Sequence, residues 1–200
     1  PVVINGLVKT YRSLLSRSSY RAVDGVTLAL EKGQCFALLG HNGAGKTTTI
    51  NMLSGMTSIS GGDCTIYGNS VVSSMATIRH DVGVCPQHDI LWSQLTAREH
   101  LRFYGHFQGM SVAAVREQSE RLLKMVHLDK LTRKAGQLSG GMQRRLSMTI
   151  AALGNKRIVF LDEPTTGLDP QNQRHVWDLI NELKQDRVVI LTTHLMDEAD

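Results

Sequence analysis

The chain has 200 residues, a length that suits one domain with a well-buried core. Apolar residues make up 42% of it and charged residues 20%, which is the balance of an ordinary globular protein and excludes disordered and fibrous classes. Its net charge of +4 comes from 22 cations and 18 anions spread along the chain, so we expect no nucleic-acid partner.

The cysteines and the hydropathy restrict the class of protein further. Three cysteines, Cys35, Cys64 and Cys85, are odd in number and lack metal-binding spacing, so free thiols in a reducing compartment are expected. No stretch reaches the roughly 18 apolar residues that cross a bilayer, and Pro1 does not open a signal peptide. Because the chain starts without Met and stops in a helix-like run, we expect it to be a piece of a longer protein.

Apolar runs that are typical of strands alternate with helical patterns along the chain. Most of these runs are continuous rather than alternating, which is typical of parallel strands covered on both faces. Strands that alternate with helices predict an α/β fold with a largely parallel sheet. The expected strands are Val2–Ile4, Phe36–Leu39, Val82–Cys85, Ile158–Leu161 and Val188–Leu191, and the expected helices lie around Thr48–Leu53, Val112–Val126, Met142–Leu153 and Val176–Leu183.

Two parts of the chain depart from this alternation. Residues of about 1–34 and 62–70 contain short strands and Gly-rich turns, which predict a small antiparallel sheet. The segment of about 89–154 has helical patterns and no convincing strand, so we expect an α-helical insertion that stands apart from the core. The serine-rich stretch Arg12–Arg21 is expected to form a flexible loop.

The segment Gly40–Thr47 fits the pattern G-x-x-x-x-G-K-[ST] and lies between a predicted strand and a predicted helix. Its glycines let backbone N–H groups face phosphate oxygens, and the helix N-terminus adds a partial positive charge. Lys46 would bridge the outer phosphates of a nucleotide, and the Thr47 hydroxyl would bind Mg²⁺. A plain glycine-rich turn is the alternative, and the strand–loop–helix context disfavours it.

Two acids, Asp162 and Glu163, follow the strand-like run Ile158–Leu161. Asp162 would hold Mg²⁺ through water, and Glu163 would polarise the attacking water. Alone, such a pair is equally typical of a strand that leaves the core. The phosphate loop in the same chain favours the catalytic interpretation.

Gln87 and His194 follow two further predicted strands. A loop Gln or His is most often a solvated surface residue. However, ligands gather beyond the carboxyl ends of parallel strands. We therefore expect Gln87, His194, the two acids and the phosphate loop to converge on one site.

The segment Leu138–Met142 follows no strand and opens an amphipathic helix. Ser139 is placed to cap that helix, and Gly140 and Gly141 leave backbone N–H groups open. This is a second helix N-terminus suited to an anion, away from the first. A helix cap with no other function is the alternative.

The chain resembles the nucleotide-binding domain of ABC transporters from about residue 2 to its end, and the Leu-Ser-Gly-Gly element separates that family from other P-loop proteins. The motifs that carry the resemblance are, in order, Gly40–Thr47, Gln87, Leu138–Gly141, Asp162-Glu163, Gly167–Asp169 and His194. The resemblance implies one ATPase domain over residues 1–200, with a P-loop NTPase core, and ATP and Mg²⁺ as its ligands.

The resemblance also assigns the site residues. It implies a nucleotide site made by Tyr11, which stacks on adenine, with Gly40, Asn42, Gly43, Gly45, Lys46, Thr47 and Thr48. It implies Thr47, Gln87 and Asp162 around the metal, and Lys46, Gln87, Glu163 and His194 as the catalytic set. Two such domains pair head to tail, so that Ser139, Gly140 and Gly141 of one contact the nucleotide of the other, while Asp169 crosses the interface.

Within the family, the chain resembles the A subfamily of eukaryotic ABC transporters in the segments Gly83–His88, Leu138–Arg145 and His194–Asp200. With His41 in it, the phosphate loop is more similar to that of the first of the two nucleotide-binding domains in this subfamily. Members of that subfamily are mostly single-chain transporters of lipids or sterols. The resemblance implies a domain at the cytoplasmic face of a membrane, coupled through Gln87 to transmembrane domains of the same polypeptide.

Three other interpretations remain open at this point. A soluble ABC ATPase of translation or DNA repair would lack membrane spans, or would carry a long coiled-coil insertion that this chain does not show. A P-loop kinase would need an acceptor pocket and an arginine-bearing lid, and would not use Leu138–Met142. A degenerate nucleotide-binding regulator is disfavoured by the intact Lys46, Asp162, Glu163 and His194.

Overall fold

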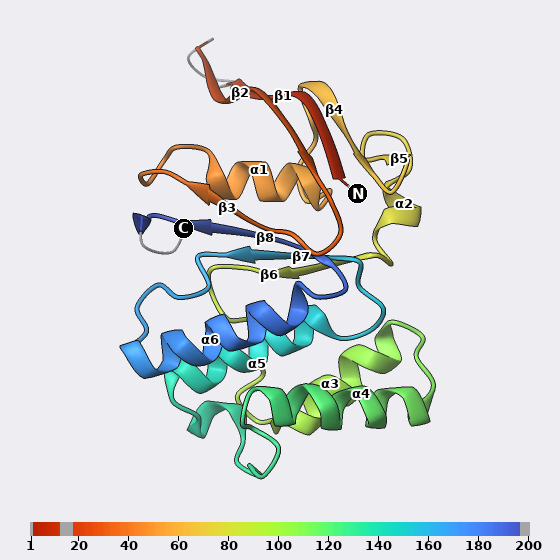
Figure 1. The fold of residues 1–200 in the computed structure, drawn as a ribbon, viewed down its shortest axis with the longest axis vertical. Coiled ribbons are helices and arrows are strands. Elements are labelled where there is room, and N and C mark those ends of the chain that lie inside the picture. The colour runs from red at the N-terminus through yellow and green to blue at the C-terminus, as the bar shows by residue number, and fades with distance from the viewer. Residues whose placement is uncertain (1, 13–17, 197–200) are drawn as a thin grey trace.

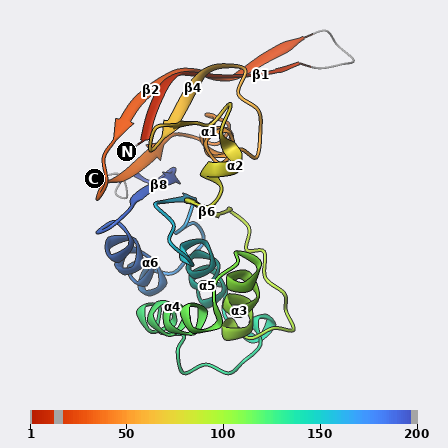
Figure 2. The same cartoon turned by 90° about the vertical axis from the view of Figure 1, so that its right-hand side faces the viewer.

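A computed structural model describes residues 2–12 and 18–196, which form two sheets with helices between them and below them (Figure 1). Helix α1 lies between the antiparallel and the parallel sheet, α5 and α6 lie under the parallel sheet, and α3 and α4 lie farthest from the antiparallel sheet (Figure 2). The elements are β1 Val2–Arg12, β2 Ser19–Leu30, β3 Cys35–Leu39, α1 Lys46–Leu53, β4 Gly61–Ile66, β5 Asn69–Ser70, α2 Met75–Ile78, β6 Val82–Cys85, α3 Ala97–Phe107, α4 Val112–Met125, the 3-10 turn Ala135–Gln137, α5 Gly140–Ala152, β7 Ile158–Asp162, α6 Pro170–Leu183 and β8 Val188–Thr193.

The central sheet has the strand order β3-β8-β7-β6, and every neighbouring pair is parallel. Strands β7 and β8 are buried along their whole length, which explains their continuous apolar sequences. Successive residues of β7 serve different cores: Ile158 and Phe160 pack with α1, whereas Val159 and Leu161 pack with the helices below. The predicted α/β class is confirmed, and the carboxyl ends of four strands meet at one edge.

The second sheet is antiparallel, with the order β2-β1-β4-β5, and it corrects the prediction of a loop over Arg12–Arg21. Strand β1 continues to Arg12, and β2 begins at Ser19, so that Tyr11 pairs with Tyr20. Backbone pairing between β1 and β2 stabilises these strands, although a serine-rich sequence has no strand pattern of its own. Residues 13–17 of the expected loop lie outside the described residues.

Helix α5 corrects the prediction that segment 89–154 stands apart as a whole. Its residues Leu146, Met148 and Ala151 join the core below the parallel sheet. The approach is so close that a Cβ atom on Gly83 of β6 would lie 1.9 Å from the Ala151 carbonyl oxygen. Of the helices in this segment, α3 and α4 lie away from the parallel sheet, whereas α5 lies against it (Figure 2).

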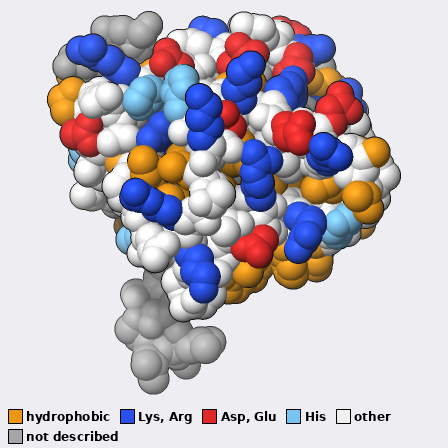
Figure 3. Space-filling view, turned by 90° about the horizontal axis from the view of Figure 1, so that it is seen from below, with side chains coloured by type: hydrophobic (Ala, Val, Ile, Leu, Met, Phe, Trp, Pro, Cys, Tyr) orange, Lys and Arg blue, Asp and Glu red, His pale blue; other side chains and the backbone are white. Residues whose placement is uncertain are grey.

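Within the described residues, no helix is long and apolar enough to span a membrane. The face that Figure 3 shows from below carries Lys and Arg side chains spread among acidic and apolar ones.

The three cysteines are free, and two of them predict an alkaline limit to stability. Burial raises the pKa of the Cys64 and Cys85 thiols to about 12 each. An unfolded thiol ionises near pH ~8.5, so the native state keeps its full stability below that pH and loses stability as the pH rises toward 12. Urea unfolding between pH 7 and 11 should show this loss.

A Cys64→Val, Cys85→Ala double variant is the control, because it removes both thiols and should flatten that decline relative to the parent chain. In the folded parent at pH 8, both thiols should resist alkylation until urea is added. An equal decline in the double variant, or rapid alkylation of both thiols in the folded chain, would contradict the prediction.

Candidate active site

The phosphate loop connects β3 to α1, and its backbone needs glycine for two reasons at Gly45. Gly45 has a φ of 91°, a left-handed conformation that favours glycine. A Cβ atom there would also lie 2.3 Å from the carbonyl oxygen of Ala22 in β2. The antiparallel sheet therefore packs directly against the start of α1. The first backbone N–H groups of that helix have no partner within it and can bind a ligand.

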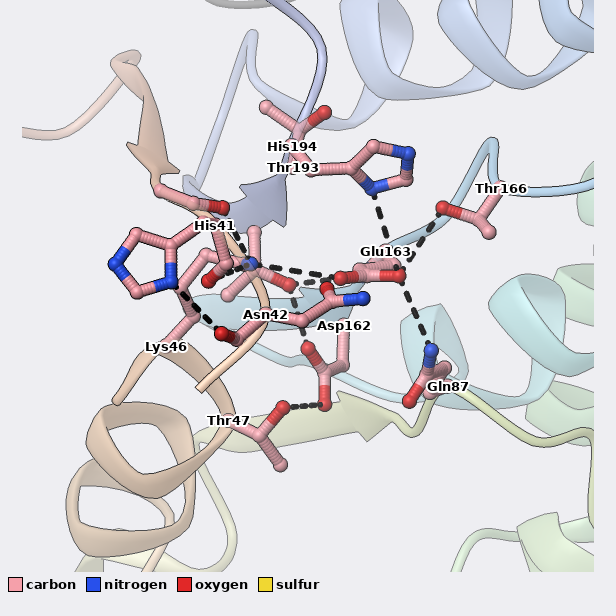
Figure 4. Close-up of polar contacts among 12 residues, drawn as sticks. His41, Asn42, Lys46, Thr47, Gln87, Asp162, Glu163, Thr166, Thr193 and His194 are labelled. Atoms are coloured by element: carbon pink, nitrogen blue, oxygen red, sulfur yellow. Dashed lines mark hydrogen bonds and ion pairs between the residues drawn. The ribbon is translucent and has the colours of Figure 1, made fainter. Parts of the chain in front are cut away.

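Lys46 is the first residue of α1, and its side chain is only 8% exposed. Its Nζ donates hydrogen bonds to the carbonyl oxygens of Gly40, at 2.7 Å, and His41, at 3.2 Å. The same nitrogen lies 3.6 Å from Oε1 of Glu163. The loop thus holds one cation between its own carbonyl oxygens and the carboxylate across the site (Figure 4).

Asp162 ends β7, and two hydroxyl groups donate to its carboxylate. Thr47 Oγ1 donates to Oδ2 at 2.8 Å, and Thr192 Oγ1 donates to Oδ1 at 2.5 Å. Thr192 also accepts the backbone N–H of Glu163 at 2.9 Å. Sequence reasoning missed Thr192, because its place opposite Asp162 follows from the parallel register of β7 and β8.

Glu163 is the residue on which the four strand ends converge (Figure 4). Its Oε2 accepts hydrogen bonds from Gln87 Nε2, at 3.1 Å, and Thr166 Oγ1, at 3.2 Å. His194 Nδ1 lies 3.8 Å from the same oxygen. Glu163 is 8% exposed, and its φ of 47° is strained for a residue with a Cβ atom. Such strain is typical of functional sites.

A cavity of about 450 Å³ lies against this cluster. It is lined by Tyr11, Tyr20, Ala22, Asn42, Gly43, Gly45, Lys46, Thr47, Thr48, Gln87 and Glu163. Of these, Tyr11 and Tyr20 are a cross-strand pair, and Lys9 Nζ lies 5.0 Å from the Tyr11 ring centroid. Tyr20 was missed because its stretch was predicted to be a loop.

Ser139, Gly140 and Gly141 do not line that cavity. Ser139 caps α5, and its Oγ accepts the backbone N–H of Met142 at 3.4 Å. Asp169 caps α6, accepting backbone N–H groups of Gln171 and Asn172 at 3.0 Å each, and the Asn172 side chain holds the pKa of Asp169 below its usual value. The structure therefore keeps these two helix starts apart from the chain's own phosphate loop.

The oxygen atoms at Thr47 and Asp162 fit a divalent cation. Mg²⁺ prefers hard oxygen ligands and usually takes one or two carboxylates together with substrate phosphates. Nowhere in residues 2–12 and 18–196 do three or more His, Cys, Asp or Glu side chains gather as a metal cage. Both observations suit a Mg²⁺ site in which the protein provides the oxygen atoms of Thr47 and Asp162 and a nucleotide provides phosphate oxygens.

The chain also matches known proteins in sequence and in fold. The profile of the family described as ABC transporter matches residues 23–166, which include the phosphate loop and both acids. The chain therefore belongs to the ABC transporter family. It is an ATPase domain of the A subfamily, because A family members match the whole of this chain at 42% to 49% identity.

Among these relatives are ABC transporter A family member 9 of Arabidopsis thaliana, 49% identical, and A family member 1 of Dictyostelium discoideum, 44% identical. Each match covers the whole chain, but the chain spans only about a fifth of these relatives, 22% and 23% of their lengths. ATP-binding cassette sub-family A member 7 of Rattus norvegicus is 44% identical over the chain, which covers 9% of its length.

Solved cassettes share the fold of this ABC domain. A dimeric post-hydrolysis state of an ATP-binding cassette bound to ADP and Pi matches with a TM-score of 0.87 and 26% identity, covering 100% of this chain and 90% of that one. A dimeric bacterial ABC transporter cassette matches with a TM-score of 0.85 and 27% identity over the same shares.

Proposed function

We propose that this ABC domain hydrolyses ATP at a site shared between two cassettes and thereby drives a lipid transporter of the A subfamily. The observation that carries the proposal is the convergence of Lys46, Gln87 and His194 on the Glu163 carboxylate (Figure 4). These three side chains follow the ends of three other strands, β3, β6 and β8. The Glu163 carboxylate that they approach lies next to a cavity lined by residues of the phosphate loop.

The residues of the site divide the hydrolytic step between them. Lys46 leaves its carbonyl partners for the outer phosphates, and the N–H groups at the start of α1 face the phosphate oxygens. Glu163 takes a proton from a water molecule, whose oxygen bonds to the γ-phosphorus while the bond to the bridging oxygen breaks. ADP and inorganic phosphate result. Gln87 and His194 hold the water and the γ-phosphate in line.

Thr47 and Asp162 would hold Mg²⁺, which supplies charge neutralisation to the phosphate oxygens. Thr192 is then a positioning residue, because one hydroxyl fixes both the Asp162 carboxylate and the Glu163 backbone. On the nucleoside side, Tyr11 and Tyr20 offer aromatic faces to adenine.

That Ser139 does not line the chain's own cavity supports head-to-tail pairing. A helix N-terminus with two glycines and a capping serine is suited to phosphate oxygens, but none of these residues lines the cavity. In a head-to-tail pair, each Ser139-Gly140-Gly141 faces the partner's nucleotide, and Asp169 lies at the interface. Two of the solved cassettes with this fold are dimers.

An apolar surface on the helical side supports a transmembrane partner. Trp92, Phe103 and Phe107 are 44%, 48% and 81% exposed, and the Phe103 and Phe107 rings stack at 6.4 Å. Trp92 and Phe103 line a hollow of about 400 Å³. Trp92 lies in the loop between β6 and α3, and the same loop contains Gln87. Cytoplasmic loops of transmembrane domains in the same polypeptide would dock here and place the cassette at the cytoplasmic face of a membrane. His41 supports an assignment as the first of two cassettes.

Lipid translocation is the prediction that tests the transported class. The full-length protein that contains this chain, reconstituted in vesicles, should move a fluorescent phospholipid between leaflets only with ATP. The same protein with Glu163→Gln is the control, because its transmembrane domains are unchanged while hydrolysis is lost. Equal lipid movement in parent and variant, or ATP turnover that never moves phospholipid or sterol, would contradict the lipid assignment and leave the ATPase assignment intact.

A further inference from the structure

Arg144 lies one turn into α5 and is only 5% exposed, although arginine is almost never buried unless its donors are satisfied. Its guanidinium donates to six acceptors, and these belong to two separate turns of the active site. Neighbouring Arg145 is equally buried, at 5% exposure, but bonds to Val126 and Gly141 instead. The two arginines therefore have different surroundings on the same helix.

The first turn that Arg144 contacts is the one that carries Glu163. Nη2 donates to the carbonyl oxygens of Asp162, at 2.6 Å, and Glu163, at 3.1 Å, while Nε donates to that of Pro164, at 3.1 Å. These bonds bracket the residue whose φ is 47°. A strained backbone persists only where its surroundings over-determine it, and three bonds from one rigid group do so here.

The second turn carries Gln87. Nη1 donates to the carbonyl oxygens of Pro86, at 2.5 Å, and Gln87, at 3.2 Å, and to Oδ1 of Asp89, at 3.1 Å. Asp89 is thus the charged partner of Arg144, and the carbonyl oxygens share the remaining donors. The planar guanidinium fixes the directions of all its N–H groups, so one side chain holds the two turns at a set separation.

We infer that Arg144 is a positioning residue that couples the turn of Gln87 and the turn of Glu163 to the N-terminal end of α5. The inference rests on the proposed function, in which that end of α5 meets the partner's nucleotide through Ser139. Movement of α5 on pairing moves the guanidinium, which then moves both turns together. The hydrolytic geometry around Glu163 and the signal through Gln87 are set by the same side chain.

Arg144→Lys tests the coupling, because it keeps the charge but loses the forked donors. Arg145→Lys is the matched control on the same helix with the same burial. We expect Arg144→Lys to lower kcat roughly ten- to a hundredfold and to leave the ATP dissociation constant within about threefold of the parent value. Arg145→Lys should lower the unfolding temperature without this loss of kcat. Asp89→Asn, which leaves the five carbonyl bonds, should have a smaller effect than Arg144→Lys.

Amide hydrogen exchange separates this inference from the proposed function. In Arg144→Lys, exchange should speed up together in residues 86–89 and 162–166, and Arg145→Lys should not show this paired change. Acceleration in only one segment, in neither, or equally in both variants would overturn the coupling, whether or not the chain hydrolyses ATP. A parent chain that fails to hydrolyse ATP would instead refute the proposed function, and the exchange result would still decide the coupling.

Discussion

Glu163→Gln is expected to keep ATP binding and to lose most of the turnover, by roughly 100-fold or more. The amide has the shape of the carboxylate and can still accept from Gln87 and Thr166, so the site stays assembled. It cannot take a proton from water, because an amide has almost no basicity. Steady-state phosphate release and calorimetric titration with ATP measure the two effects separately.

The control for this prediction is Glu120→Gln, which removes a carboxylate from the exposed surface of α4. It should behave as the parent chain in both assays. If Glu163→Gln and the parent release phosphate at equal rates, Glu163 is not the general base.

Lys46→Ala is expected to weaken ATP binding roughly ten- to a hundredfold, the range that follows from losing hydrogen bonds of about 1.5–3 kcal/mol to a charged group. The lost contacts would be those of Nζ with the outer phosphates. Calorimetry measures the affinity, and an unfolding temperature checks that the buried site survives without its cation. Lys32→Ala, in the loop between β2 and β3, is the surface control. Unchanged affinity in Lys46→Ala would contradict the phosphate-loop assignment.

Lys46→Ala should also abolish ATP hydrolysis, and mixing it with a second variant tests whether cassettes pair head to tail. Lys46→Ala retains an intact Ser139, and Ser139→Glu retains an intact phosphate loop. Each variant alone should be inactive in hydrolysis, because every composite site contains one damaged half. Mixed pairs contain one site with both halves intact, so the mixture should regain activity. A mixture that stays as inactive as its components would contradict the composite site.

The sequence by itself determined the centre of this site, because its signals are local. The phosphate loop is recognisable from spacing, glycine chemistry and its position between a strand and a helix. Continuous apolar runs indicated parallel strands, and parallel strands place their carboxyl ends at one edge. It follows that Gln87, Asp162, Glu163 and His194 had to meet the loop, and the structure brings them together. The end of the His194–Asp200 motif, residues 197–200, lies outside the described residues.

Only the tertiary structure decided the residues that support this centre. Tyr20 lines the cavity because the pairing of β1 with β2 places it opposite Tyr11, which a serine-rich stretch does not reveal. Helix α5 can lie close against the sheet because Gly83 has no Cβ atom to clash with the Ala151 carbonyl oxygen. The hydrophobic periodicity of α5 predicts an apolar face but not the surface against which that face packs. The contacts of Arg144 and Thr192 join residues far apart in the sequence, at distances fixed by that packing. Local patterns specify strands, turns and caps, whereas side chains that link distant turns are defined only when the packed layers fix their separation.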